Sequence, residues 1–167
     1  MKLNTMKDLY VDQLRDLYSA EDQLISALPK MAQAATSSDL QKAFQDHLSE
    51  TRGQKQRLEQ IFSGLGMSPQ GETCQAMQGL IKEGEQIINA QADPTVRDAA
   101  LIAAAQRVEH YEMAGYGSVR TFADELGFSN AKSLLQQTLD EEGATDKKLT
   151  SLAQGGLFSS GINQKAV

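Results

Sequence analysis

The sequence predicts an all-α protein: a four-helix bundle with an additional short helix in a long crossover between helices two and three. Three observations support this fold class. Apolar residues recur every three or four positions along most of the 167-residue chain. Only three prolines interrupt it. No alternating run rich in Val, Ile and Thr indicates a strand.

Two long helices are expected in the N-terminal part of the chain. The first runs from about residue 4 or 5 to about residue 35, and Pro29 either kinks it or starts a new segment. The turn over residues 36–39 supplies an N-cap for the second helix. That helix runs to about residue 65, because Gly64 and Gly66 end it.

Three further helices are expected after a linker. A short helix covers about residues 72–90. The third long helix starts at Asp93 and Pro94, which form an N-cap followed by proline at the first helical position. It runs to about residue 126, and the fourth long helix covers about residues 130–153.

The connection between the two pairs of long helices determines the expected topology. Helices one and two form one antiparallel hairpin, and helices three and four form another. About thirty residues join the hairpins, which suits the crossover of a ferritin-like bundle better than an up-down-up-down bundle. One constant shift of the chain matches Glu21 with Glu112 and Glu50 with Glu141, which supports two similar halves. We therefore expect a ferritin-like bundle over residues 1–155 and a flexible C-terminal tail over residues 156–167.

The charge and the cysteine content argue against several classes of function. A net charge of −6 disfavours nucleic acid or an anionic membrane as a partner. The single cysteine, Cys74, cannot form an intramolecular disulfide, and we expect a packed or partly exposed thiol rather than a nucleophile. Residues 1–10 lack the apolar core of a signal peptide, and no apolar run approaches a membrane span. A cytoplasmic protein is expected.

Acidic residues interrupt the apolar faces of the long helices. Glu109 and Glu112 lie one turn apart in the middle of the apolar stripe of the third long helix. Glu21 holds a similar position in the first helix. In the fourth helix, Glu142 continues the apolar face better than Glu141 does. Burying unpaired carboxylates costs several kcal/mol each or forces them to bind protons, so a positive partner is expected, and metal is the favoured one.

The second long helix adds a histidine to this set. His47 and Glu50 are spaced three residues apart, so they project from one face on successive turns. After His47, the inward face of this helix continues through either Glu50 or Thr51. Carboxylates from four helices at one level could bridge two cations, with His47 as a terminal ligand of iron or manganese. Such oxygen-rich ligation disfavours a closed zinc site. The candidate metal ligands are Glu21, His47, Glu50, Glu109, Glu112 and Glu142.

Several of these features also have ordinary structural explanations. A single glutamate in a helical pattern can face solvent, and His47 alone can be a hydrogen-bonded, half-buried histidine. Asp146 is either a ligand or acceptor near the site, or the surface partner of the adjacent lysines. Tyr18 and Tyr116 are expected to fill the core, with a hydroxyl bonded to a ligand carboxylate. His110 lies on the opposite side of its helix and is expected at a surface or subunit contact.

Four segments of the chain, in this order and spacing, resemble the YciE/YciF family of bacterial ferritin-like stress proteins. They read LYSAEDQL, DHLSETRGQ, RDAALIAAAQRVEHYEMAGYGS and LDEEGATDKKL. The resemblance covers about residues 5–155. It implies a five-helix bundle similar to rubrerythrin, a homodimer and a di-iron site.

The resemblance also implies roles within the wider di-iron carboxylate pattern. That pattern has Glu on helices one and three and Glu-x-x-His on helices two and four. Glu21 and Glu109 match the first pair, and Glu112 matches the extra carboxylate of rubrerythrin-like members. Glu50 and Glu142 match the glutamates of the second pair.

The two histidines of that pattern are absent from their positions. Gly53 and Thr145 stand there instead. We expect His47, one turn before the helix-two glutamate, to replace one histidine and Asp146 to compensate for the other. This departure from the pattern affects nitrogen ligation, metal affinity and dioxygen activation.

Three functions are compatible with these residues. The favoured one is a stress protein with a carboxylate-bridged pair of iron or manganese ions that performs redox chemistry on peroxide or dioxygen. Because the chain has no Cys-x-x-Cys pair, its electrons would come from an unknown separate donor. The alternative is a non-catalytic homodimeric stress or interaction protein whose metal is structural or absent. A ferritin-type storage cage is a third option, against which the implied dimer argues.

Overall fold

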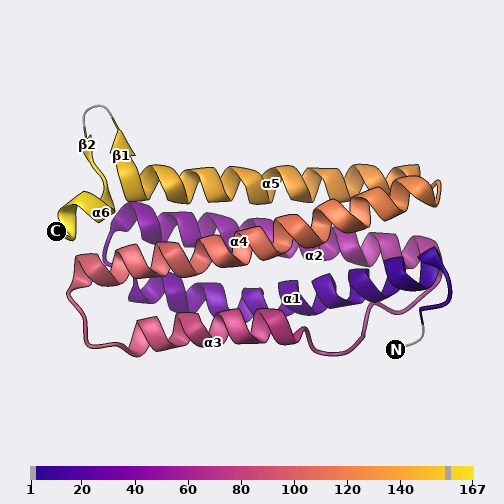
Figure 1. Ribbon diagram of the computed structural model, residues 1–167, viewed down its shortest axis with the longest axis horizontal. Coiled ribbons are helices and arrows are strands. Elements are labelled where there is room, and N and C mark those ends of the chain that lie inside the picture. The colour runs from indigo at the N-terminus through magenta and orange to yellow at the C-terminus, as the bar shows by residue number, and fades with distance from the viewer. Residues whose placement is uncertain (1–2, 157–158) are drawn as a thin grey trace.

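The computed structural model describes residues 3–156 and 159–167 and confirms an all-α helical bundle. Five helices lie side by side along the long axis of the molecule (Figure 1). They are α1 (Met6–Ala34), α2 (Ser38–Leu65), α3 (Gln75–Asn89), α4 (Pro94–Glu125) and α5 (Ser129–Gln154). Within the described ranges, none of the helices combines the length and the apolar character needed to cross a membrane.

The four long helices form a closed ring. α1 packs against α2, α2 against α5, α5 against α4, and α4 against α1. α1 and α2 run antiparallel and are joined by a short turn, as are α4 and α5, so the two expected hairpins are present (Figure 1). α3 lies in the crossover between α2 and α4 and covers α1 and α4 from outside the ring.

The helix boundaries follow local capping chemistry. The Thr5 side chain accepts a hydrogen bond from the backbone N–H of Asp8, and the Asp8 carboxylate accepts one from the backbone N–H of Thr5. α2 ends at Gly66, whose φ of 66° suits a residue without a side chain. The Asp-Pro pair at residues 93–94 starts α4 as expected. α1 continues through Pro29, so the proline does not start a new segment.

The turn between α1 and α2 is held by a buried acid from α4. Asp98 is 3% exposed. Its carboxylate accepts hydrogen bonds from the backbone N–H of Thr36 at 2.8 Å and from that of Ser37 at 2.7 Å. These charge-assisted bonds satisfy two donors that the turn leaves free. They join the end of one hairpin to the other and so help to set the levels of the helices.

A polar layer divides the apolar core into two clusters. One cluster includes a residue from each long helix: Leu24, Phe44, Ile102 and Leu149. The other cluster also includes a residue from each long helix: Leu14, Leu58, Tyr116 and Leu135. Along every long helix, the change from one cluster to the other falls near the middle of the helix. The residues between the clusters therefore lie at one level across the bundle.

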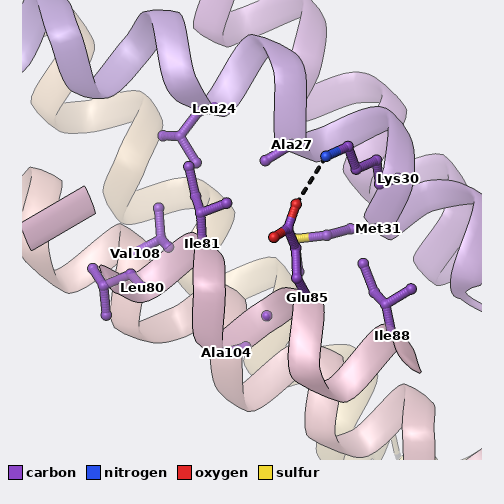
Figure 2. A pocket seen from close by; sticks show the side chains of 11 residues that line it. Leu24, Ala27, Lys30, Met31, Leu80, Ile81, Glu85, Ile88, Ala104 and Val108 are labelled. Atoms are coloured by element: carbon purple, nitrogen blue, oxygen red, sulfur yellow. Dashed lines mark hydrogen bonds and ion pairs between the residues drawn. The ribbon is translucent and has the colours of Figure 1, made fainter. Parts of the chain in front are cut away.

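α3 closes one side of the core and leaves a small cavity against α1 and α4 (Figure 2). Leu24, Ile81 and Val108 are among its lining residues. The volume is about 20 Å³, close to that of one water-sized probe. Its lining is apolar apart from Lys30 and Glu85, whose Nζ and Oε1 atoms pair at 2.8 Å. A cavity this small and apolar is a gap in packing between α3 and its neighbours.

The C-terminal residues fold back onto the bundle. β1 (Gly155–Gly156) pairs antiparallel with β2 (Ser159–Ser160), and α6 (Ile162–Lys165) packs against α4 and α5. Ile162 is buried in the same cluster as Leu149. Only glycine fits at position 161 in this arrangement, because a Cβ there would overlap the carbonyl oxygen of Ala153. The flexibility expected for residues 156–167 stays a prediction, and its residues 157 and 158 lie outside the described ranges.

Candidate metal centre

Four glutamates form the acidic part of the polar layer. Glu21 comes from α1, Glu109 and Glu112 from α4, and Glu142 from α5. Each of them is at most 1% exposed. They are buried because each occupies a position on the apolar stripe of its helix, between the two core clusters. An ionised carboxylate in such surroundings needs a charged or hydrogen-bonding partner.

One imidazole faces these acids. His47 of α2 is 3% exposed, and its Nε2 lies 3.3 Å from Oε1 of Glu109. His47, Glu109, Glu112 and Glu142 each offer one ligand atom, and these four atoms lie within 4.8 Å of one another. Nitrogen and oxygen ligands bind cations such as zinc at about 2.0–2.2 Å. Small side-chain movements would therefore gather the four atoms around a common cation.

Most of the carboxylate oxygens in the layer have no hydrogen-bond partner among the described residues. These are Oε2 of Glu21, Oε2 of Glu109, both oxygens of Glu112 and Oε2 of Glu142. Buried polar atoms in folded proteins are almost always hydrogen-bonded. Several unpartnered oxygens at one place indicate that the layer accommodates cations, protons or water that the chain itself does not supply.

Burial gives these carboxyl groups unusual acidities. It raises the pKa of Glu21, Glu109 and Glu112 well above the ordinary value of 4.5, and the negative charge of Glu142 raises the pKa of each further. Burial also raises the pKa of Glu142, although the nearby His47 opposes that change. Without a cation, the layer therefore keeps protons at pH values at which exposed glutamates are ionised. A bound metal ion would displace those protons.

Tyr116 holds one of the carboxylates in place. Its hydroxyl is fully buried and donates a hydrogen bond to Oε1 of Glu21. Burial and the charge of Glu21 raise the pKa of Tyr116 well above its usual range, so the phenol keeps its proton. The expected bond between a core tyrosine and a carboxylate is thus present for Tyr116. Tyr18 differs from the expectation, because its hydroxyl donates to Glu59 at the surface, at 3.1 Å.

Glu50 lies at the edge of the layer and not in its interior. Its side chain is 44% exposed, whereas Thr51 is fully buried. Oε2 of Glu50 is 3.6 Å from Nδ1 of His47 and accepts a hydrogen bond from the Thr145 hydroxyl at 3.3 Å. The nearby His47 imidazole lowers the pKa of Glu50. Glu50 is therefore outside the group of four close ligand atoms and contacts the histidine from behind.

The inward face of α2 explains this difference. Helical periodicity from His47 places Thr51 and Gln54 toward the interior, and both are fully buried. The shift that relates the two halves of the sequence matches these residues with Glu142 and Thr145 of α5, which are also buried. Gln54 was not among the predicted site residues. Its position one turn after Thr51 on the apolar face of α2 is the sequence feature that indicates its burial.

The family of the chain follows from its similarity to known proteins. A family profile described as Domain of unknown function (DUF892) matches residues 5–166. The chain belongs to this family. It is 46% identical to Protein YciF of Escherichia coli (strain K12) over 167 residues, which are 99% of this chain and 98% of YciF. The resemblance to the YciE/YciF stress proteins is thereby confirmed.

Solved structures support the same family assignment. The crystal structure of the E. coli stress protein YciF matches with a TM-score of 0.87 and 47% identity, covering 90% of this chain and 95% of that one. YcfI from Rhodopseudomonas palustris matches with a TM-score of 0.88 and 46% identity, covering 91% and 97%. A protein from Xanthomonas campestris pv. campestris, with a TM-score of 0.70 and 18% identity over 88% and 89%, shares the fold.

Three further acidic or basic residues of this DUF892 chain lie outside the group of close ligand atoms. Glu141 pairs with Arg57, whose guanidinium NH2 is 2.5 Å from Oε2, so it faces the rim of the layer. Asp146 accepts a hydrogen bond from Gln106 at 3.0 Å and lies 3.5 Å from Nε2 of His110. His110 is 68% exposed, as expected for a surface residue. Among the described residues, no lysine pairs with Asp146.

Cys74 is a packed thiol at the start of α3. It is 1% exposed, and its sulfur accepts a hydrogen bond from the backbone N–H of Met77. Sγ also lies 3.0 Å from the Tyr111 hydroxyl and 3.3 Å from Oδ2 of Asp16. Burial raises the pKa of the thiol, which disfavours the nucleophilic thiolate form. Cys74 is therefore a buried structural cysteine and not an activated nucleophile.

Proposed function

We propose that this protein binds two metal ions, iron or manganese, in its polar layer and uses them for redox chemistry on peroxide or dioxygen in the cytoplasm. One observation carries the proposal. Glu21, Glu109, Glu112 and Glu142 are buried together, and each has at least one oxygen without a partner among the described residues. Buried carboxylates of this kind are common ligands of metal ions inside helical bundles.

The charge of the layer favours two ions over one. The four buried glutamates carry four negative charges when ionised, although Glu21 lies outside the group of four close ligand atoms. His47 is neutral when it binds a metal ion. Two divalent cations balance four ionised carboxylates, whereas with one cation two of the carboxyl groups would have to keep their protons to avoid uncompensated charge in an apolar core. An uncompensated buried charge is strongly destabilising.

The types of ligand favour iron or manganese. Carboxylate oxygens suit manganese and, together with imidazole, non-haem iron. A structural zinc site would use cysteine and histidine ligands, but Cys74 packs beside Asp16 and Tyr111 and is not in the group of close ligand atoms. His47 is the sole imidazole in that group.

The surrounding residues would prepare the layer for chemistry. When bound, the metal ions would supply the one-electron steps that peroxide or dioxygen requires. His47 would bind through Nε2, while Glu50 orients the ring from the Nδ1 side. Tyr116 holds Oε1 of Glu21 and keeps its own proton. The apolar clusters on both sides exclude bulk water from the layer.

The test uses chelator-treated, metal-free protein. Ferrous iron added without oxygen should bind at about two ions per chain. Subsequent addition of peroxide or air should produce a ferric absorption band and consume the oxidant. Glu112→Gln should reduce both binding and oxidant consumption, whereas Glu59→Gln, a change at an exposed position of the same bundle, should not. Failure of the parent protein to bind either ferrous iron or Mn²⁺ overturns the proposal.

A non-catalytic role is the second candidate, and one observation favours it. Gln54 and Thr145 occupy the inward positions three residues after Thr51 and Glu142, and neither is a histidine. Among the described residues, His47 is therefore the one that offers an imidazole nitrogen to a metal ion in the layer. A metal held mostly by oxygen would then stabilise a homodimeric stress or interaction protein without turnover. Metal that raises the unfolding temperature but never promotes oxidant consumption supports this version, and sizing in solution tests the dimer and excludes or reveals a storage cage.

A further inference from the structure

Gln54 lies fully buried in the polar layer, and its two amide atoms have different surroundings. Nε2 donates hydrogen bonds to Oε1 of Glu142 and, at 3.3 Å, to Oε2 of Glu141. Oε1 has no partner among the described residues. An amide oxygen withdrawn from water without a partner costs about 1–3 kcal/mol, so its burial here needs an explanation.

The orientation of the Gln54 amide is fixed by its neighbours. Once metal is bound and Glu142 is ionised, its oxygens can only accept hydrogen bonds, so the NH2 group of Gln54 would face Glu142 and Glu141, as it does in this structure. A flipped amide would place its oxygen against two acidic groups. The unpartnered Oε1 therefore points away from these two contacts while it stays in the interior.

The spacing of Gln54 from His47 suggests what this oxygen meets. The two residues are seven apart on α2, which is about two helical turns and about 10 Å along the axis. They project from the same inward face, and both are buried. Glu142 lies near both, because its carboxylate belongs to the group of His47 and accepts the bond from Gln54. Paired metal ions lie about 3.5–4 Å apart, so the two side chains are placed to serve different ions.

We propose that the amide oxygen of Gln54 is a ligand of the metal ion farther from His47, while its amide nitrogen positions Glu142. This inference rests on the proposed function, since it requires two ions in the layer. The two positions then differ in chemistry: one has an imidazole nitrogen and the other has only oxygen ligands. Oxygen-only ligation suits hard cations such as Mn²⁺. The ions bind in order, first at the His47 position and then at the Gln54 position.

The experiment measures Mn²⁺ binding to metal-free protein by calorimetry and electron paramagnetic resonance. The parent protein should bind two Mn²⁺ ions with separable affinities, and the first ion should show coupling to a histidine nitrogen. Gln54→Leu, of similar size, should keep the nitrogen coupling of the first ion and should weaken the second ion by about 10–100-fold, far more than the first, which loses only the amide contact to Glu142. His47→Leu should instead remove the nitrogen coupling. A merely structural role for Gln54 would weaken both ions together.

A second variant keeps the test informative if the leucine variant folds poorly. Gln54→Glu retains an oxygen at the same position, and in its protonated form the other oxygen donates to Glu142 in place of the amide, so at mildly acidic pH it should retain the second ion, with circular dichroism confirming the fold. Two Mn²⁺ ions bound by Gln54→Leu with parental affinities, or loss of the second ion in Gln54→Glu, would overturn the inference and leave the two-ion proposal standing. Absence of any Mn²⁺ or ferrous iron binding by the parent protein would defeat the proposed function itself.

Discussion

His47 of α2 and Glu109 of α4 meet across the diagonal of the bundle, with Nε2 of the histidine 3.3 Å from Oε1 of the glutamate. The helices that carry them are not neighbours in the ring of four. At this level, polar groups from opposite helices occupy the space that apolar side chains fill above and below. A change of charge in the layer therefore acts on all four helices, and the stability of the fold reports it.

The pH dependence of stability should differ between metal-free and metal-loaded protein. Burial raises the pKa of Glu21, Glu109 and Glu112 above 4.5, so the unfolded chain releases these protons at lower pH than the folded chain does. Their stabilising contribution is complete below the unfolded pKa and is lost as pH rises through the folded values. The urea midpoint of metal-free protein should fall as the pH rises above the ordinary glutamate pKa of 4.5 and through the raised folded values. With metal bound the fall should largely disappear; a flat metal-free profile would contradict this account.

Neutralising Glu112 should stabilise the protein while metal is absent. Both of its carboxylate oxygens lack a partner among the described residues, and its pKa is raised by burial and by Glu142. Glu112→Gln should raise the free energy of unfolding of metal-free protein at pH 8 by about 1–3 kcal/mol. The same change should abolish most of the stabilisation that metal gives. Thermal unfolding with and without Mn²⁺ measures both effects, and Glu59→Gln serves as the exposed control.

Removing the Tyr116 hydroxyl should weaken the layer through Glu21. Among the described residues, the side chain of Glu21 has one hydrogen bond, which the buried Tyr116 hydroxyl donates to Oε1. Tyr116→Phe should cost about 1–3 kcal/mol in the free energy of unfolding, because a buried carboxyl oxygen loses its hydrogen-bond donor. A double-mutant cycle with Glu21→Gln should show that the two changes are not additive. Tyr18→Phe at the surface should have little effect, and additive effects of the two core changes would argue against the bond.

The hydrogen bonds from the turn between α1 and α2 to Asp98 provide a test of the fold that is independent of metal. Asp98 accepts two short bonds from Thr36 and Ser37, and Asp98→Ala would remove the charged acceptor of both partly buried backbone donors. We expect a loss of about 2–4 kcal/mol in the free energy of unfolding. Asp98→Asn, which can satisfy only one of the donors, should lose less. Metal stoichiometry should be unchanged in both variants, as measured by elemental analysis.

The bundle and most of its polar layer were accessible from the sequence. The apolar stripe gave the helices, and Glu21, Glu109, Glu112 and Glu142 stood out because carboxylates on that stripe conflict with burial. Caps such as the Asp-Pro pair at residues 93–94 fixed the helix starts. These features are local or periodic, so a single sequence records them.

The remaining details depend on the exact rotation of each helix. One residue turns the α-helix by about 100°, so three- and four-residue spacings could not separate Glu50 from Thr51 on α2. Gln54 attracted no attention because a neutral amide on an apolar stripe does not demand a partner as a carboxylate does. The return of the C-terminal residues depends on one buried side chain, Ile162, in a polar segment. No periodic pattern marks such a contact.

The role of Glu50 distinguishes the sequence pattern from the observed geometry. The pattern makes it a metal ligand, whereas the structure places it at the half-exposed edge, beside Nδ1 of His47. Glu50→Gln should leave the stability of metal-free protein within about 0.5 kcal/mol of the parent. It should weaken Mn²⁺ binding by about tenfold, because an orienting partner of the histidine is weakened. Calorimetry should still count two ions per chain. If one ion is lost outright, Glu50 is itself a ligand and moves inward when metal binds.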